Sequence, residues 1–228
     1  MANVAFVLTS HDAVGANGES TGVWLEELAT PYYRLVDAGH NVTLSSVRGG
    51  AVPISPESLR PPAGTAATVQ RWLSDKAASA VLASTGNVAA LSASQLDAIV
   101  VPGGHGALWD LPSNAVVTAL IETLLATGRC VAAICHGPAA LVQARDANGQ
   151  PCVAGRNVAA FTVAEERAAG LADDIPLLLE NELRALGAHI VSAPAFEACA
   201  VRDDNLITAQ NPASAEAFAE HMLAALAP

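Results

Sequence analysis

Three short apolar runs constrain the fold of this 228-residue chain more than any other feature of its sequence. They occupy residues 4–8, 98–101 and 131–134, are rich in Val, Ile or Ala, and are each followed by small or polar residues that suit a turn. A strand that is apolar at every position must be covered on both of its faces. Helical patterns lie between the runs, so we predict an α/β fold with a mostly parallel central sheet and helices on both faces, in three layers.

The helical patterns show where the covering layers come from. In residues 22–38, apolar side chains recur every three or four positions, which is the spacing of a helix with one buried face. A second pattern of this kind follows Ser113, a residue type that caps helix N-termini, and ends near Gly128. Residues 176–186 and 213–226 predict two further helices, each introduced by a proline, which the first helical turn tolerates.

Residues 48–62 interrupt the alternation of strands and helices. They hold four of the thirteen prolines of the chain and two adjacent glycines. Such a composition favours an irregular excursion at the surface. We therefore predict a single domain over residues 1–228, with an irregular insertion around 48–91.

Composition and charge limit the classes of binding partner and the cellular compartment that we expect for this chain. The formal net charge is −11 and the few Lys and Arg are scattered, so we expect no nucleic-acid partner and no binding to anionic membranes. No apolar run approaches the roughly 20 residues of a transmembrane helix, and the N-terminus lacks the basic stretch of a secretion signal. The four cysteines show no CxxC spacing, which favours a reducing cytoplasm.

Cys135 is the strongest candidate for chemistry. It lies in Ala-Ile-Cys-His-Gly-Pro (residues 133–138), between an apolar strand and a predicted helix, and the residues two before and two after it, Ala133 and Gly137, are small. This is the steric pattern of a nucleophile elbow with Cys in place of Ser. On such a turn, at a helix N-terminus, we expect the sulfur to be exposed and partly ionised at neutral pH. The alternative is a buried cysteine that fills space, which we favour for the other three cysteines.

Further positions could complete a site around Cys135. His136 lies next to it and could relay protons, or could be a surface histidine whose backbone alone matters. Residues 100–106, Val-Val-Pro-Gly-Gly-His-Gly, end another predicted core strand. There the N–H groups of Gly104 and His136 could form an oxyanion hole, and the alternative is an ordinary glycine turn.

Acidic side chains are candidates at two places. Glu27 lies one residue off the apolar stripe of its helix, so it can face inward, where a carboxyl beside a thiol stays protonated and donates a hydrogen bond to sulfur. The adjacent Glu26 and an ordinary solvated helix face remain alternatives. The same two alternatives, an inward-facing acid or a solvated helix face, apply to Glu165 and Glu166, just after Phe161-Thr162.

Taken together, these motifs resemble the ThiJ/PfpI superfamily. The branch they resemble most is the heat-shock chaperone type, also described as glutathione-independent glyoxalase (glyoxalase III) and as class I glutamine amidotransferase-like proteins. The matching motifs run in order from residue 4 to about 217: Thr21-Gly22-Val23 with Glu27 and Pro31, then residues 103–106, residues 133–138, Phe161-Thr162, and Asn211-Pro212-Ala213-Ser214.

The resemblance implies a flavodoxin-like sandwich and a homodimer. It also implies a nucleophile, a proton-relaying histidine, an inward-facing acid and an acid that orients the histidine, which fall on Cys135, His136, Glu27 and Glu166. The last position follows from the spacing to Phe161, and Glu165 is its reserve. Gly104 and His105 are the expected oxyanion-stabilising and substrate-binding positions, and no metal or other cofactor is expected.

The predicted activity is conversion of a small 2-oxoaldehyde such as methylglyoxal to a 2-hydroxy acid. Cys135 would attack the aldehyde carbon to give a hemithioacetal, and a base, His136 or Glu27, would move a proton to the neighbouring carbon. Hydrolysis of the resulting thioester would release lactate. The alternatives are deglycation of proteins, amide or peptide hydrolysis by the same residues, and a holding chaperone or redox sensor.

Overall fold

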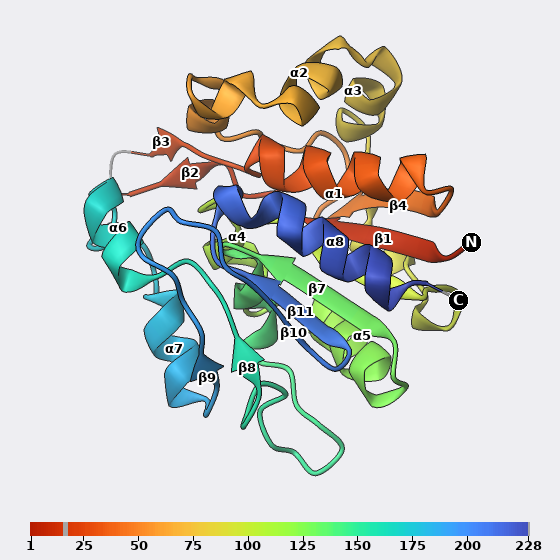
Figure 1. The fold of residues 1–228 in the computed structure, drawn as a ribbon, viewed down its shortest axis with the longest axis vertical. Coiled ribbons are helices and arrows are strands. Elements are labelled where there is room, and N and C mark those ends of the chain that lie inside the picture. Colours follow the sequence, from red (N-terminus) through yellow and green to blue (C-terminus); the bar gives the residue numbers. More distant parts are fainter. Residues whose placement is uncertain (16–17, 228) are drawn as a thin grey trace.

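The computed structural model describes residues 1–15 and 18–227. In this part of the chain one sheet has seven strands, in the order β10-β11-β7-β6-β1-β4-β5 (Figure 1). Neighbouring strands are parallel except β10, which is antiparallel to β11 at one edge. The strands of this sheet are β1 (Asn3–Leu8), β4 (Asn41–Ser46), β5 (Gly86–Asn87), β6 (Ala98–Val101), β7 (Cys130–Ile134), β10 (Ala200–Asp203) and β11 (Leu206–Ala209).

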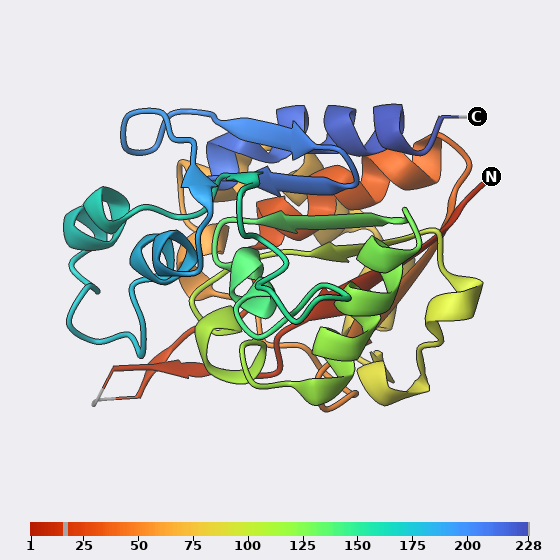
Figure 2. The same cartoon turned by 90° about the horizontal axis from the view of Figure 1, so that it is seen from below.

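Helices cover both faces of the sheet, which confirms the predicted three-layer α/β architecture. Figure 2 shows α1 and α8 on one side of the strands and α5 on the other. No helix within the described ranges is long and apolar enough to cross a membrane. The helices are α1 (Leu25–Asp37), α2 (Ala67–Ser74), α3 (Lys76–Leu82), α4 (Ala107–Asp110), α5 (Ala115–Ala126), α6 (Val163–Ala169), α7 (Leu179–Ala185) and α8 (Ala215–Ala225).

Short elements complete the described chain. The hairpin β2 (Ala13–Val14) and β3 (Glu19–Ser20) is antiparallel, and β8 (Asn157–Val158) pairs with β9 (His189–Ile190) in parallel. Short 3-10 helices occur at η1 (Pro56–Leu59), η2 (Ala63–Thr65), η3 (Val88–Ala90), η4 (Ala93–Gln95), η5 (Gly137–Leu141) and η6 (Pro212–Ser214).

Strand β1 shows why the apolar runs lack alternation. Phe6 and Leu8 belong to the hydrophobic cluster under α1 and α8, whereas Ala5 and Val7 belong to the cluster under α5. All four side chains are fully buried. Complete burial of a large apolar side chain is worth about 1.5–3 kcal/mol, so an apolar residue at every position stabilises both layers at once.

The helix boundaries differ from the prediction by a few residues. Helix α5 is capped by Asn114, whose side-chain oxygen accepts hydrogen bonds from two first-turn N–H groups, so the predicted cap at Ser113 is wrong by one residue. The other three predicted helices begin two or three residues later than expected, as α1, α7 and α8. The segment before α1 is extended because the N–H of Trp24 donates to the carbonyl of Gly103 in the loop after β6.

The insertion around 48–91, predicted to be irregular, is irregular only in its first half. Its second half contains α2, α3 and strand β5, which extends the sheet. The reason is Trp72, which is fully buried with its ring 5.1 Å from that of Tyr32 and 6.0 Å from that of Tyr33, both on α1. The excursion is therefore a second layer packed on α1, as Figure 1 shows.

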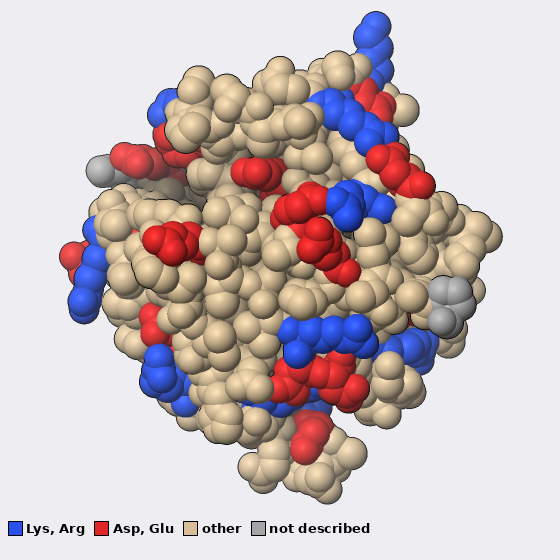
Figure 3. All heavy atoms as spheres, viewed as in Figure 1, with Lys and Arg blue, Asp and Glu red and all other residues tan. Residues whose placement is uncertain are grey.

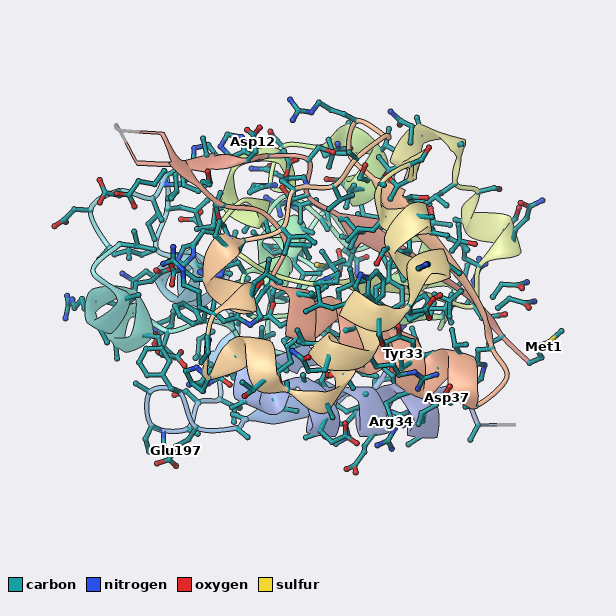
Figure 4. All side chains as sticks on the ribbon, turned by 90° about the horizontal axis from the view of Figure 1, so that it is seen from above. Met1, Asp12, Tyr33, Arg34, Asp37 and Glu197 are labelled. Carbon is teal, nitrogen blue, oxygen red and sulfur yellow. The ribbon has the colours of Figure 1, made fainter. Side chains whose placement is uncertain are left out.

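A surface contact adds to this docking of α2 on α1. The guanidinium carbon of Arg71 lies 3.8 Å from the centre of the Tyr33 ring, and two of its nitrogens donate to Asp37 at 2.6 and 2.8 Å. Tyr33 and Asp37 are labelled in Figure 4. Exposed ion pairs contribute little by themselves, so the apolar burial of Trp72 stabilises the docking more than the Arg71–Asp37 pair does.

The charged residues form no continuous basic stripe on the face drawn in Figure 3, where Lys and Arg side chains lie apart with acidic groups between them. Several are paired, as Arg34 is with Glu216 and Arg156 with Asp203. The exclusion of nucleic-acid and membrane partners stays a prediction.

The strand order determines where a site can form. The chain leaves β1 toward β4 on one side and returns as β6 and β7 on the other, so the connections diverge at the carboxyl ends of β1 and β6. In open parallel sheets such a divergence creates a crevice for ligands. Helix α6 and the β2–β3 hairpin lie at this same edge in Figure 1.

A pair of leucine substitutions tests whether the 48–91 excursion belongs to the core. Leu82 at the end of α3 is 4% exposed, and Leu73 in α2 is 53% exposed. Leu82→Ala is expected to lower the free energy of unfolding by about 2–5 kcal/mol, because it empties a packed site. The matched control Leu73→Ala is expected to change it by about 0.5 kcal/mol or less. Urea unfolding followed by circular dichroism measures both, and equal losses would contradict the packing described.

Candidate active site

Cys135 lies on a turn at the carboxyl end of β7 and has a φ of 62°, a left-handed conformation that is uncommon for a residue with a Cβ. The turn is held on both sides, because the Cys135 N–H donates to Ala209 over 2.8 Å and its carbonyl accepts from Phe161 over 3.0 Å. A strained conformation that neighbouring strands enforce in this way is typical of functional sites.

The smallness of Gly137 has a different cause from the one predicted. A Cβ at this position would lie 2.0 Å from the carbonyl oxygen of Val101, which belongs to the neighbouring strand β6. The constraint therefore comes from contact between the turn and strand β6, and not from crowding against Ala133. The turn continues into the 3-10 helix η5, and not into the α-helix that we expected.

The prediction of an exposed and partly ionised thiol is wrong. Cys135 is 3% exposed, and burial raises its pKa well above the ordinary value, with a further increase from the neighbouring Glu27. A hydrogen bond from the N–H of Gly104 favours the thiolate but only offsets part of this shift. The sulfur is therefore a neutral thiol at rest, and it needs a base close by if it is to react as a thiolate.

Glu27 is one of the two groups beside the thiol. It lies in the first turn of α1 and is fully buried, whereas Glu26 remains partly exposed. Its Oε2 accepts the Gly103 N–H over 2.9 Å, and its Oε1 accepts no hydrogen bond from the described residues. Burial raises the pKa of Glu27 to about 8, although contacts with Cys135 and Gly103 act in the opposite direction. The carboxyl is mostly protonated at neutral pH.

His136 is the other group beside the thiol. Its Nδ1 lies 3.2 Å from the Cys135 sulfur, and its Nε2 lies 2.8 Å from Oε1 of Glu166. The second carboxyl oxygen of Glu166 lies 3.0 Å from Nε2 of His105. One carboxylate on α6 thus contacts two imidazoles, whose ring centres are 4.2 Å apart.

The pKa shifts of Glu166 and His136 indicate which atoms of this cluster carry protons. Burial by itself would raise the pKa of Glu166, but the hydrogen bonds from His105 and His136 outweigh it and lower the pKa to about 2. Burial and the nearby His105 lower the pKa of His136 to about 4, against the opposing effect of Glu166. Neutral His136 therefore donates its Nε2 proton to an ionised Glu166, and its Nδ1 turns a lone pair toward the thiol.

Glu165, the reserve for this role, lies away from His136. It begins α6 in a capping box with Thr162, a pattern readable in the sequence as Thr-x-x-Glu. Its fully buried carboxylate accepts hydrogen bonds from two further segments of chain. The donors are the Phe196 N–H at 2.9 Å, Gln210 Nε2 at 3.1 Å and Asn211 Nδ2 at 2.8 Å. Glu165 thus anchors the loop between β9 and β10.

The two glycine positions named from the sequence bring backbone donors to the same place. Gly104 has a φ of 95°, and a Cβ there would lie 2.0 Å from the carbonyl oxygen of Gly22. A Cβ on Gly103 would lie 2.6 Å from the N atom of His136, so the β6 loop and the Cys135 turn are in direct contact. The N–H groups of Gly104 and His136 donate to no backbone carbonyl of the described residues.

A cavity of about 160 Å³ reaches the Cys135 thiol and the His136 ring. Sequence reasoning missed two of its walls. Trp24 is one of the apolar residues whose spacing predicts the first helix, yet it lines the cavity, and its buried indole Nε1 has no partner within residues 1–15 and 18–227. Phe196 carried no motif, and only its place in the fold brings it here. The lining residues are Trp24, Gly104, His105, Cys135, His136, Phe161, Ala169, Phe196 and Pro212.

One group at this site has the donor chemistry of a metal centre. His105, His136 and Glu166 each offer a ligand atom, and these atoms lie within 4.8 Å of one another. Two imidazoles and a carboxylate suit Zn²⁺. Both imidazoles already donate to Glu166, so a metal would have to displace both protons. The absence of a metal or cofactor stays a prediction.

Known proteins resemble the chain over most of its length. Glutathione-independent glyoxalase hsp3102 of Schizosaccharomyces pombe is 27% identical over 92% of this chain and 91% of that protein. Protein/nucleic acid deglycase HchA of Escherichia coli is 34% identical over 149 residues, which are 61% of this chain and only about half, 52%, of that protein. The crystal structure of Rapid Encystment Protein 24 kDa of Francisella tularensis matches with a TM-score of 0.95 and 36% identity, covering 100% of both chains.

A model of a whole protein family also matches most of the chain. The model of the DJ-1/PfpI family matches residues 20–225, a stretch that contains Glu27, the Cys135 turn and both acids of α6. The resemblance inferred from the motifs is thereby confirmed. With the sheet order, the left-handed cysteine turn and this match in agreement, the chain belongs to the DJ-1/PfpI family.

Proposed function

We propose that this chain is a cofactor-independent glyoxalase that converts small 2-oxoaldehydes, such as methylglyoxal, to 2-hydroxy acids. One observation carries the proposal: a buried thiol lies between two proton-transfer groups, His136 and Glu27, at a cavity of about 160 Å³. The similarity to hsp3102, a glutathione-independent glyoxalase, along nearly the whole chain supports it.

The first step is attack of the Cys135 sulfur on the aldehyde carbon. The Nδ1 lone pair of His136, 3.2 Å from the sulfur, accepts the thiol proton as the carbon–sulfur bond forms. The N–H groups of Gly104 and His136 stabilise the negative charge on the aldehyde oxygen until His136 returns the proton to it. The product is a neutral hemithioacetal, and no free thiolate is needed beforehand.

The second step moves hydrogen between the two carbons. Glu27, as a carboxylate, removes the proton from the sulfur-bearing carbon, and the electron pair of that bond forms an enediolate. Glu27 then returns the proton to the neighbouring carbon, while the hydroxyl proton of the hemithioacetal passes to the former ketone oxygen. This gives a 2-hydroxy thioester with no net oxidation.

The last step is hydrolysis. Water adds to the thioester carbon, the carbon–sulfur bond breaks, and the sulfur leaves as the Cys135 thiol while the 2-hydroxy acid departs. The sum is one oxoaldehyde plus one water giving one hydroxy acid. Glu166 takes no proton in this scheme, because its low pKa keeps it ionised, and it orients His136 throughout.

Two conservative substitutions with matched controls test the proposal. Cys135→Ser and Glu27→Gln are expected to reduce kcat/KM for lactate formation from methylglyoxal, without glutathione, by at least about a hundredfold. Cys130→Ser, at the buried opposite end of the same strand, and Glu26→Gln, one residue from Glu27, are expected to stay within about threefold of wild type. Lactate formation that persists in Cys135→Ser would refute the mechanism.

The pH dependence of the reaction follows from Glu27. Because the pKa of Glu27 is raised to about 8, the carboxyl is protonated below that pH and becomes a base above it. We expect kcat/KM for methylglyoxal to rise as the pH passes through about 8. The pKa values of His136 and Glu166 are low, about 4 and 2, so these two groups cause no further change in kcat/KM above pH 5. A profile measured from pH 5 to 9.5 that is flat, or falls toward pH 9, contradicts this role.

Deglycation is a second candidate, supported by the 34% identity with the E. coli deglycase. The same cysteine would attack the carbon of a methylglyoxal adduct on an amine or thiol. Lactate released from methylglyoxal-modified N-acetylcysteine, in the presence of a scavenger that removes free methylglyoxal, would support this activity. Complete suppression of lactate by the scavenger would leave the glyoxalase reaction as the source.

A further inference from the structure

The outer part of the active-site cavity is apolar. Beyond Gly104, Cys135 and the two histidines, its walls are Trp24, Phe161, Ala169, Phe196 and Pro212, and among the described residues no acidic or basic side chain other than the histidines lines it. Apart from the unpaired indole N–H of Trp24, a wall of this composition gives a hydroxyl or a charge no hydrogen-bond partner, so most polar groups placed there lose their hydrogen bonds to water. The outer part of the cavity therefore favours an apolar group on the ligand that binds there.

The aromatic rings form a row that leads away from the reacting sulfur. The His136 ring lies 4.5 Å from that of Phe161, centre to centre, and the Phe161 ring lies 6.3 Å from that of Phe196. Because the first ring of the row, His136, lies against the sulfur, a 2-oxoaldehyde bonded to the sulfur through its aldehyde carbon would have the row within reach of its ketone carbon. The substituent on the ketone carbon would then contact Phe161 and Phe196.

Phe196 is held in this position against its backbone preference. It has a φ of 64°, which is unusual for an aromatic residue, and its side chain is 52% exposed at the mouth of the cavity. Figure 4 labels the next residue, Glu197, on the same loop at the edge of the molecule. The N–H of Phe196 donates to the buried carboxylate of Glu165, which fixes the loop. An exposed ring in an enforced conformation suggests a surface that is completed when a ligand covers it.

We propose that Phe196, with Phe161 and Trp24, forms a recess that selects 2-oxoaldehydes by the apolar group on their ketone carbon. The recess favours an aryl substituent, as in phenylglyoxal, over the hydrogen of glyoxal and over the polyhydroxylated chain of a sugar-derived dicarbonyl. This inference rests on the proposed glyoxalase function and adds the substrate class to it. Aromatic contact of this kind gives a moderate preference, and not an absolute one.

The test compares two substrates in each variant, so that their different intrinsic reactivities cancel. The quantity is the ratio of kcat/KM for mandelate formation from phenylglyoxal to kcat/KM for glycolate formation from glyoxal. Phe196→Ala is expected to lower this ratio about fivefold, because the aryl group loses an aromatic partner. Phe196→Leu, which keeps apolar bulk, is expected to lower it less.

Val191→Ala is the matched control, since Val191 is an exposed apolar residue between β9 and β10 that does not line the cavity. It is expected to leave the ratio unchanged. A ratio in Phe196→Ala that equals or exceeds that of wild type overturns the proposal, because Phe196 would then be indifferent to the aryl group or a barrier to it. Thermal unfolding of each variant verifies that the fold is retained.

A binding measurement separates the recess from the reaction. Acetophenone and acetone are unreactive ketones that differ in the same aryl group, and their binding can be followed through the indole N–H resonance of Trp24, assigned with Trp24→Phe. Acetophenone is expected to bind more tightly than acetone to wild type, and to lose this advantage in Phe196→Ala. If wild type turns over no oxoaldehyde but still binds acetophenone more tightly than acetone, the proposed function is refuted and the proposed recess is supported. Equal binding of the two ketones overturns the recess.

Discussion

A reciprocal pair of hydrogen bonds between α1 and the loop after β6 brings the site together. The N–H of Trp24 donates to the Gly103 carbonyl at 3.1 Å, and the N–H of Gly103 donates to Glu27 at 2.9 Å. A Cβ on Gly103 would meet the His136 N at 2.6 Å and both Cys135 and Glu27 at 2.8 Å. Only glycine permits this approach, and without it the acid, the thiol and the imidazole would not share one space.

Two glutamates at this site hold opposite protonation states because their surroundings differ. Glu27 is fully buried beside a thiol and accepts one backbone N–H, and burial raises its pKa to about 8, whereas Glu166 accepts hydrogen bonds from two imidazoles that lower its pKa to about 2. The first is therefore suited to moving protons and the second to holding a histidine in one tautomer. A single residue type is thus suited to two different tasks, and a third glutamate, Glu165, anchors a loop through its hydrogen bonds.

The local patterns in the sequence predicted much of the fold. Fully apolar runs, with no alternation, identified buried strands, because both faces of β1 are covered. Helix ends were less accurate: Asn114 caps α5 in place of Ser113, since either residue type can accept the first-turn hydrogen bonds and only the path of the chain chooses between them. The 48–91 excursion was misjudged because the burial of Trp72 depends on α1, which lies far away in the sequence.

The sequence by itself determined the strand-turn-helix order, the cysteine on a tight turn, and the small set of acids and histidines from which a site could be built. These features depend on local sterics and on periodicity, which neighbouring residues express directly. The tertiary structure decided that the thiol is buried and neutral, that Glu166 and not Glu165 contacts His136, and that Phe196 reaches the cavity. Burial, pKa and the walls of a cavity arise from segments that meet only after the sheet has assembled, so no local pattern specifies them.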